Sequence, residues 1–229
     1  MIITIGGGIS QMSEVYLMKT DQLKDDALFR DRYHTLSLAR QKKIDRFIFK
    51  KDKQLSLAAG LVFQAGLDNY GLREQELTIA HHENGKPFIS EHPNLYFNIS
   101  HSENLAICAF SSCEIGADVE KVTPIDLAIA KQFFYGSEYR DIITSDCPED
   151  TFFDYWVLKE SYMKATGLGF KLPLNDFRIA LAEDIRVYVD EIQRPYGFYQ
   201  ATVFEHYKLA ICIKGDPPDL QLSFINAAS

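Results

Sequence analysis

Two acidic residues stand where their spacing could support metal or phosphate chemistry. Asp118 and Glu120 are two residues apart in Ile115-Gly116-Ala117-Asp118-Val119-Glu120, a segment otherwise made of apolar and small residues. Alternate residues of a β-strand point to the same face, so the two carboxylates would lie side by side and repel each other. A metal, or a phosphate with its metal, between them is one interpretation, and a solvated face of a sheet is the other.

Glu160 and Lys164 lie on a predicted helix that covers residues 148–167. Pro148, Glu149 and Asp150 are residue types favoured in the first turn of a helix. Gly167 can adopt the left-handed conformation that commonly ends one. Residues three and four positions apart share a helix face, which puts both charged side chains on an apolar stripe that includes Trp156. A carboxylate there is costly without a partner. Glu160 could pair with Lys164, leaving Lys159 in solvent, or it could bind a cation.

The composition limits the classes to which the chain can belong. It has 229 residues, of which 46% are hydrophobic and 24% charged, as is usual for a soluble globular protein. A formal net charge of -8 argues against nucleic-acid binding through a broad basic face. The four cysteines show no zinc-like spacing with the six histidines, and no apolar run is long enough to span a membrane. We therefore expect a cytoplasmic protein with free thiols.

The order of predicted elements indicates an α+β fold. Helical patterns cover residues 25–49, 55–66 and 125–139 before the helix at 148–167. Strand patterns at 95–100, 105–110 and 115–120 predict an antiparallel meander. The start of the chain, with its three consecutive glycines, predicts a flexible leader, and the tail from Gly215 predicts an irregular end. The segment 25–49 is rich in lysine and arginine, which fits either a solvated face or a local anion site.

A short internal repeat divides the chain. Leu105-Ala106-Ile107-Cys108 recurs about 100 residues later as Leu209-Ala210-Ile211-Cys212. A helix, a glycine and a short strand precede each copy in the same order. We interpret this as two similar α+β halves, residues 1–113 and 114–229, with the cleft between them as the default ligand site.

Four motifs in this order resemble the surfactin-synthetase-activating (Sfp-type) 4'-phosphopantetheinyl transferases. They are Gly85-Lys86-Pro87, Phe97-Asn98-Ile99-Ser100-His101-Ser102, Gly116-Ala117-Asp118-Val119-Glu120-Lys121, and Trp156-Val157-Leu158-Lys159-Glu160-Ser161 followed by Lys164 and Gly167-Leu168-Gly169. The resemblance implies transfer of phosphopantetheine from coenzyme A to a serine of an apo carrier protein, with Mg²⁺ as cofactor and release of 3',5'-ADP. It also implies two α+β halves related by a pseudo-twofold, with coenzyme A in the cleft between them.

The resemblance also assigns roles to individual residues. It implies that the metal ligands are Asp118, Glu120 and Glu160, and Glu160 is our candidate for the base that takes the serine proton. Lys159 and Lys164 are implied as phosphate contacts, with Lys164 better placed to assist the leaving group. The implied contacts of coenzyme A are Lys86, Ser100 and His101.

The chain departs from the family at Leu55, where many relatives have an arginine expected to hold the 3'-phosphate of coenzyme A. The candidates to replace it are the nearby cations Arg46, Lys50 and Lys53, which precede this position in the chain. The carrier protein of such enzymes is acidic and helical. For its docking we expect an apolar surface that includes Ile125, Phe133, Phe134 and Tyr135, although the same pattern also fits an inward-facing helix core.

Two other classes of function would use part of the same residues. A Mg²⁺-dependent phosphatase acting on a nucleotide would need the three carboxylates, but it would release inorganic phosphate and need no carrier. A binding module without catalysis would be expected to lose a carboxylate or Lys164, and all four residues are present. We expect a monomer.

Overall fold

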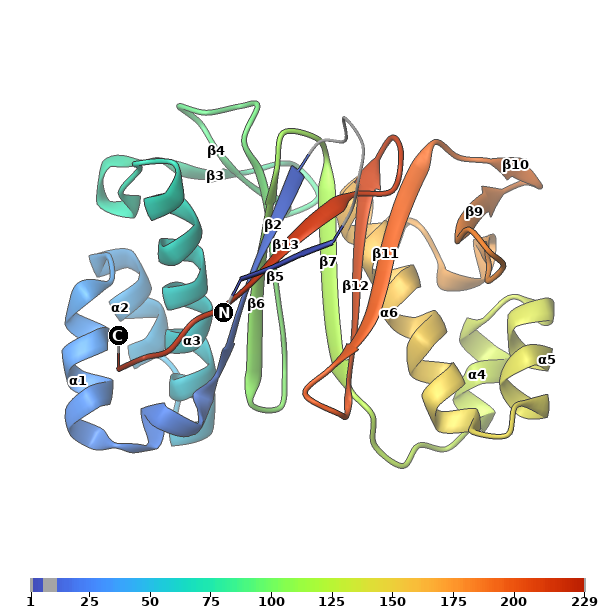
Figure 1. The fold of residues 1–229 in the computed structure, drawn as a ribbon, viewed down its shortest axis with the longest axis horizontal. Helices are drawn as coiled ribbons and strands as arrows, with labels where there is room; N and C mark the ends of the chain where they lie inside the picture. The colour runs from blue at the N-terminus through green and yellow to red at the C-terminus, as the bar shows by residue number, and fades with distance from the viewer. Residues whose placement is uncertain (1, 6–11, 229) are drawn as a thin grey trace. The chain divides into compact units, whose positions relative to one another are not determined.

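The computed structural model describes residues 2–5 and 12–228, which form two compact units (Figure 1). Each unit contains helices and strands, which confirms the predicted α+β class. The three glycines of the predicted leader fall within residues 6–11, outside the described residues. None of the described helices is long and apolar enough to cross a membrane.

The first unit contains Met1–His82, Pro87–Ser112 and Asp219–Ser229. Its main sheet has the strand order β1-β13-β2-β6-β5, in which β2 pairs parallel with β13 and all other neighbours are antiparallel. β3 and β4 form a separate hairpin. The bounds of these strands are β1 (Ile2–Ile5), β2 (Met12–Lys19), β3 (Ile79–His81), β4 (Pro87–Ile89), β5 (Tyr96–Ser102), β6 (Leu105–Ser111) and β13 (Asp219–Phe224).

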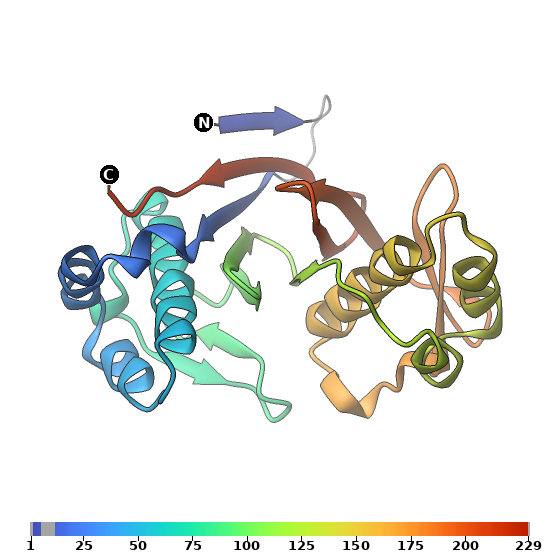
Figure 2. The same cartoon turned by 90° about the horizontal axis from the view of Figure 1, so that it is seen from below.

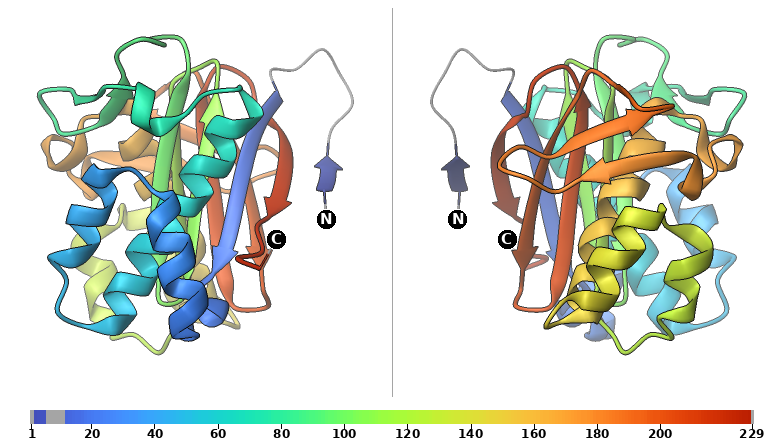
Figure 3. Two further views of the ribbon diagram at one scale, coloured as in Figure 1. Left: turned by 90° about the vertical axis from the view of Figure 1, so that its left-hand side faces the viewer. Right: turned by 90° about the vertical axis from the view of Figure 1, so that its right-hand side faces the viewer.

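The helices of this unit are α1 (Asp26–Thr35), α2 (Leu38–Asp45) and α3 (Lys50–Asn69), with short 3-10 turns η1 (Thr20–Lys24) and η2 (Glu74–Glu76). The left view of Figure 3 shows α1 to α3 in front of the strands. The segment predicted as one helix over 25–49 is two helices, because the Ser37 hydroxyl caps α2 by accepting a hydrogen bond from Arg40 N (3.3 Å).

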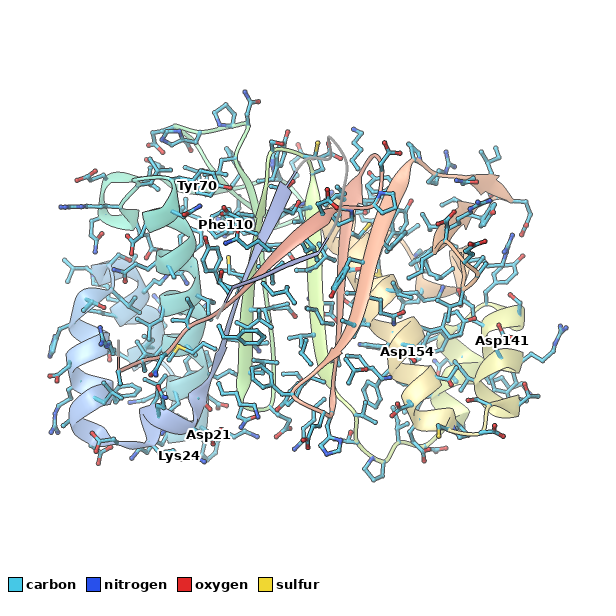
Figure 4. All side chains as sticks on the ribbon, in the orientation of Figure 1. Asp21, Lys24, Tyr70, Phe110, Asp141 and Asp154 are labelled. Carbon is cyan, nitrogen blue, oxygen red and sulfur yellow. The ribbon has the colours of Figure 1, made fainter. Side chains whose placement is uncertain are left out.

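The core of the first unit lies between α3 and the sheet. Leu57, Phe63 and Leu67 of α3 are fully buried, and the Phe63 ring stacks on Phe110 of β6 with centroids 5.7 Å apart. Tyr70 adds a tilted contact to Phe110 at 5.9 Å (Figure 4). Each buried phenylalanine contributes about 1.5–3 kcal/mol through removal of apolar area from water. The predicted core helix at 55–66 is therefore confirmed as the middle of α3.

The second unit contains Glu83–Lys86 and Cys113–Pro218. Its main sheet has the order β11-β12-β7, fully antiparallel, and a smaller sheet has the order β10-β9-β8. Its strands are β7 (Ile115–Lys121), β8 (Phe177–Ala180), β9 (Arg186–Val189), β10 (Ile192–Gln193), β11 (Tyr196–Val203) and β12 (Tyr207–Lys214). Its helices are α4 (Ala128–Phe133), α5 (Gly136–Thr144) and α6 (Pro148–Thr166), with turns η3 (Gly169–Lys171) and η4 (Leu174–Asp176).

Helix α6 is the central element of the second unit. It packs against β7 and β12 on one side and against α5 on the other (Figure 2). Pro148 stands in its first turn and Gly167 ends it in the left-handed conformation (φ 68°), as the sequence predicts. Ten of its residues are buried, Lys159 and Ser161 among them, so the helix is buried on most of its circumference and not along a single stripe.

Two sequence predictions about strands are wrong. The third strand of the expected meander, β7, pairs with β12, so only β5 and β6 form a hairpin. The tail from Gly215 is not irregular, because Asp219–Phe224 forms β13 between β1 and β2 in the first unit. Leu220 and Leu222 alternate into the core with 1% and 4% exposure, which is the pattern of a half-buried strand. One segment of the first unit ends at Ser112, residues 83–86 belong to the second unit, and residues 219–229 belong to the first. The division into halves 1–113 and 114–229 stays a prediction.

The internal repeat corresponds to equivalent elements. Leu105–Cys108 lies on β6 and Leu209–Cys212 lies on β12, and each of these strands is the middle one of three antiparallel strands. In each unit a long helix packs on those strands, α3 on β6 and α6 on β12. The repeat therefore marks two similar folds, and their relation by a pseudo-twofold stays a prediction.

Candidate active site

Helix α6 contacts strand β7 at a glycine. A Cβ atom placed on Gly116 would lie 2.0 Å from Ser161 O and 2.3 Å from Ala165 N, both backbone atoms of α6. Because alternate residues share a strand face, Gly116 lies on the same face as Asp118 and Glu120. The missing side chain thus lets the helix approach the face of β7 that bears the two acidic residues.

Asp118 meets Lys164 across this contact. Lys164 Nζ donates a hydrogen bond to Asp118 Oδ1 at 2.6 Å, and the Asp118 residue is only 2% exposed. A short charge-assisted bond of this kind offsets the cost of burying the carboxylate. Lys164, which the sequence suggested as the i,i+4 partner of Glu160, therefore forms its ion pair with Asp118 on β7.

Glu160 lies near both of these groups. Burial raises the pKa of the half-buried Glu160 carboxyl, the charge of Asp118 raises it further, and Lys164 acts in the opposite direction. Charges shift the pKa of a carboxyl in this way only when they lie close to it, so Glu160 lies near both Asp118 and Lys164. The structure thus brings together Asp118, Glu160 and Lys164, which the sequence analysis placed on two separate elements.

The carboxylates fit a hard divalent cation in their chemistry. Mg²⁺ prefers oxygen ligands and is commonly held by one or two carboxylates, with water or substrate oxygens in its remaining positions. Asp118 and Glu160 supply such oxygens, and Glu120 follows Asp118 on the same strand face. Among the described residues, no three acidic, histidine or cysteine side chains are already grouped closely enough to hold a metal. The donor types fit Mg²⁺, and the complete ligand set stays a prediction.

Lys159 does not occupy the position that the resemblance implied. Its side chain is 0% exposed, and its ammonium group donates to Leu174 O (2.8 Å) and Phe177 O (2.7 Å) and pairs with Glu138 Oε2 (2.9 Å). These three partners use the three N–H bonds of a lysine. The expected phosphate contact by Lys159 is therefore contradicted, and so is the alternative that left Lys159 in solvent.

Lys86 is held by backbone carbonyls. Its Nζ donates to Ile115 O at 3.0 Å and to Ala165 O at 2.8 Å, which joins the start of β7 to the last turn of α6. Burial lowers the pKa of Lys86 to about 8. The turn that contains Lys86 would by itself predict a surface lysine, and the structure instead gives it acceptors at a helix C-terminus.

Lys208 was not singled out in the sequence, although it is a charged residue in the apolar strand β12. Its side chain is 8% exposed and pairs with Asp150 (3.0 Å) and Asp154 (3.2 Å) on the first turns of α6 (Figure 4 labels Asp154). Gln200 Nε2 also donates to Asp154 Oδ1 (3.1 Å). A lysine inside the otherwise apolar run 207–213 was the signal that could have indicated this second link between sheet and helix.

The first unit contains a cavity of about 520 Å³ formed by α2, α3 and β5. His101 lines it together with Phe97 and Ile99, which share its face of β5, whereas Ser100 lies on the alternate face. The structure thus places Ser100 and His101, two of the three residues expected to contact coenzyme A, on opposite faces of β5. Only His101 belongs to the cavity wall.

The same wall carries two cations that the sequence analysis did not select. Arg40 and Lys43, three residues apart on α2, line the cavity beside Leu55. Arg40 is fixed there by Glu74 (2.7 Å) and by the Phe63 ring, 4.7 Å from its guanidinium carbon. Their i,i+3 spacing within the basic segment was the available signal.

The cations proposed to replace the family's arginine lie elsewhere. Lys50 pairs with Asp26 at 2.6 Å. Among the described residues that line the cavity, neither Arg46 nor Lys53 appears. The described cavity wall beside Leu55 therefore contains Arg40 and Lys43 and none of the three cations expected to replace the arginine.

The apolar segment after β7 is divided between core and surface. Phe134 is 4% exposed and packs against Phe152 at a centroid distance of 5.1 Å, so the helix-core interpretation holds for it. Ile125 also packs against this core. Phe133 and Tyr135 are 38% and 37% exposed and remain candidates for an interaction surface.

Comparison with known proteins identifies the family. Residues 114–212 match the family model of the 4'-phosphopantetheinyl transferase superfamily, and residues 25–113 match that of the 4'-phosphopantetheinyl transferase N-terminal region. This chain belongs to the 4'-phosphopantetheinyl transferase superfamily. It resembles the Sfp type within it: Bacillus subtilis Sfp is 36% identical over 77% of this chain and 81% of its own length.

Two further relatives and one solved structure were compared. The Bacillus subtilis 4'-phosphopantetheinyl transferase ffp is 37% identical, with the same coverage as Sfp. The Aneurinibacillus migulanus 4'-phosphopantetheinyl transferase gsp is 31% identical over 88% of this chain and 86% of its own length. The structure of Thermotoga maritima holo-[acyl-carrier-protein] synthase is 17% identical to this chain and has a TM-score of 0.39, over 45% of this chain and 64% of its own.

Proposed function

We propose that this chain transfers the 4'-phosphopantetheine group of coenzyme A to a serine hydroxyl of an apo carrier protein and releases 3',5'-ADP. Its membership of the 4'-phosphopantetheinyl transferase superfamily supports this reaction. The observation that carries the proposal is the shared environment of Asp118, Glu160 and Lys164, where β7 and α6 meet.

The cavity of the first unit is the proposed site for the phosphate-bearing adenosine end of coenzyme A. Arg40 and Lys43 on its wall are cations suited to a phosphate, and His101 adds a further polar group. A local cationic wall matters because the chain carries a formal net charge of -8 and would otherwise repel an anionic substrate. We propose that Arg40 and Lys43 supply the contact for which many relatives use an arginine at the position of Leu55.

The proposed chemical step is a substitution at the β-phosphorus of coenzyme A. The serine oxygen forms a bond to that phosphorus while the bond from the phosphorus to the bridging oxygen breaks, and the electron pair leaves with 3',5'-ADP. Glu160 is the proposed acceptor of the serine proton, because its carboxyl lies near Asp118 and Lys164 where α6 meets β7. Lys164 offsets negative charge that develops on the leaving group.

We propose Mg²⁺ as the cofactor, held by Asp118, Glu120 and Glu160. When bound, it supplies a Lewis acid that polarises the pyrophosphate oxygens. The support for this assignment is the set of oxygen donors on the facing surfaces of β7 and α6.

The proposed partner is a small acidic carrier protein. Phe133 and Tyr135 are the exposed aromatic residues that we propose as part of its docking surface. A cytoplasmic location belongs to the same proposal, and its support is that the four cysteines are free thiols.

Chromatographic analysis of the small-molecule products tests the proposal. The protein is incubated with coenzyme A, Mg²⁺ and an apo acyl carrier protein, and the same mixture without the carrier is the control. We expect 3',5'-ADP to accumulate only when the carrier is present. Release of inorganic phosphate, or product formation without the carrier, would instead identify a phosphatase or pyrophosphatase.

A further inference from the structure

Lys159 and Glu138 form an ion pair that the proposed reaction does not use. Both side chains are 0% exposed, and Lys159 Nζ lies 2.9 Å from Glu138 Oε2. Lys159 also donates to Leu174 O and Phe177 O, and its ammonium lies 4.1 Å from the centroid of the Phe177 ring. The lysine that precedes Glu160 in the chain is therefore fully occupied within the protein.

Glu138 is equally saturated. Its Oε1 atom accepts a hydrogen bond from Ile179 N at 2.6 Å, and its Oε2 atom accepts one from Tyr135 N at 2.8 Å in addition to the lysine. The carboxylate thus joins the start of α5, the strand β8 and the middle of α6. A buried polar network in which every member is satisfied gives the surrounding segments one defined arrangement.

Stability alone is a weak explanation for this pair. Burial lowers the pKa of Lys159 and raises that of Glu138, so desolvation opposes the charged form of both groups. Replacing a buried ion pair by apolar side chains is often neutral or stabilising, whereas removal of one partner is costly. A fully satisfied pair at such a position suits a role in fixing geometry.

The position of Lys159 on α6 connects the pair to the proposed active site. An α-helix turns about 100° per residue, so Lys159 faces α5 and β8 while the next residue, Glu160, faces another side. Lys164 shares the Glu160 side at i,i+4, and its contact with Asp118 fixes where that side points. A second link of α6 to α5 runs from the Tyr155 hydroxyl to Asp141 Oδ2 (2.7 Å; Figure 4 labels Asp141).

We propose that Lys159 and Glu138 are positioning residues, which fix the rotation of α6 about its axis so that Glu160 and Lys164 face Asp118, and that Lys159 does not contact coenzyme A. The proposal rests on the proposed function for its kinetic consequence. The geometry behind it is an ion pair anchored by four backbone groups, with Glu160 directly after Lys159 in the chain, and it does not depend on that function.

The test compares Lys159→Met, Glu138→Gln and the control Lys171→Met, which changes an exposed lysine. Glu138→Gln keeps an oxygen for Ile179 N, so it is the variant to use where Lys159→Met does not fold. For each folded protein, calorimetry gives the dissociation constant of coenzyme A, and kinetics with an apo acyl carrier protein give kcat per folded molecule at a temperature well below Tm. Hydrogen exchange of the amides of α6 is measured on the same samples.

We expect kcat to fall by about tenfold or more in both variants, because small displacements of reacting groups are costly in rate. The dissociation constant of coenzyme A should stay within about twofold of the wild type, and amide exchange in α6 should become faster. Lys171→Met should leave all three quantities unchanged.

Two results would overturn the proposal. Weaker binding of coenzyme A by about tenfold or more would make Lys159 a substrate contact after all. A lower Tm with unchanged kcat per folded molecule would make the pair merely structural. If the wild-type protein transfers no phosphopantetheine, the proposed function fails separately, and unchanged amide exchange in α6 of the variants would then refute the positioning role.

Discussion

The contact at Gly116 predicts a large effect from the addition of one methyl group. In Gly116→Ala, the new Cβ would lie 2.0 Å from Ser161 O, whereas ordinary van der Waals contacts begin at 3.4 Å. The neighbours are backbone atoms of α6, so relief requires the helix to move away from β7 by about 1.4 Å, the difference between these distances. The bond from Lys164 to Asp118, 2.6 Å in the structure, would then lengthen to about 4 Å and be lost.

Overpacking of this kind costs about 1–3 kcal/mol, and the backbone contacts at Gly116 favour the upper end. For a chain of this size, a loss of about 3 kcal/mol lowers Tm by roughly 6–12 °C. Displacement of Glu160 and Lys164 by more than 1 Å should also lower kcat by about 100-fold at temperatures where the variant is folded.

Gly136→Ala is the matched control, because its Cβ would have no neighbour within 4 Å. Scanning calorimetry and the rate of 3',5'-ADP release are measured for both variants. We expect Gly136→Ala to behave as the wild type. If Gly116→Ala kept the wild-type Tm and kcat, the close approach of α6 to β7 would not be what positions the site, and the reasoning would be refuted.

Three further predictions concern charged groups. Removal of Arg40 or Lys43 should raise the KM for coenzyme A by about tenfold or more with little change in kcat, because a hydrogen bond to a charged group contributes about 1.5–3 kcal/mol. Lys164→Met should raise the pKa of Glu160 in the metal-free protein, measured by NMR titration of its carboxyl group, because Lys164 lowers that pKa. Lys86→Met should abolish a rise of the unfolding free energy with pH between about 8 and 10.5, the folded and unfolded pKa values of Lys86, because the unfolded chain binds more protons there.

A control variant or a contradicting result tests each of these predictions. Lys50→Ala should leave the KM for coenzyme A unchanged, because Lys50 pairs with Asp26 and not with the cavity wall. A pKa of Glu160 that is the same in the wild type and in Lys164→Met would show that this lysine does not act on the carboxyl. Denaturant titrations that give wild type and Lys86→Met the same dependence on pH would show that burial of the Lys86 ammonium is not costly.

Local patterns were sufficient to predict many elements. The helix that ends at Gly167 and the strand that bears Asp118 follow from glycine and proline positions and from side-chain periodicity, which act within a few residues. Strand pairing was not predictable in the same way, because β7 pairs with β12 some 90 residues later in the chain, and periodicity carries no information about partners at that distance. The tail strand β13 was missed although Leu220 and Leu222 alternate as in a half-buried strand.

The candidate site shows the same limit. The spacing of Asp118 and Glu120 and the helix face of Glu160 indicated the acidic group from sequence alone. The partner of each lysine depends on residues that are distant in the sequence. Lys159 forms a buried ion pair with Glu138, and Lys164 forms an ion pair with Asp118 on β7. A residue type and its spacing do not determine whether an ammonium faces solvent, a carboxylate or backbone carbonyls.

The central claim is the transfer of phosphopantetheine to a carrier serine, and intact-mass spectrometry of the carrier tests it most directly. An apo acyl or peptidyl carrier protein is incubated with coenzyme A, Mg²⁺ and either the wild-type protein or Glu160→Gln. We predict that the wild type adds the mass of one phosphopantetheine group to the carrier and that the variant adds none. An unchanged carrier mass with the wild type, across a panel of carriers and with coenzyme A bound, would contradict the account.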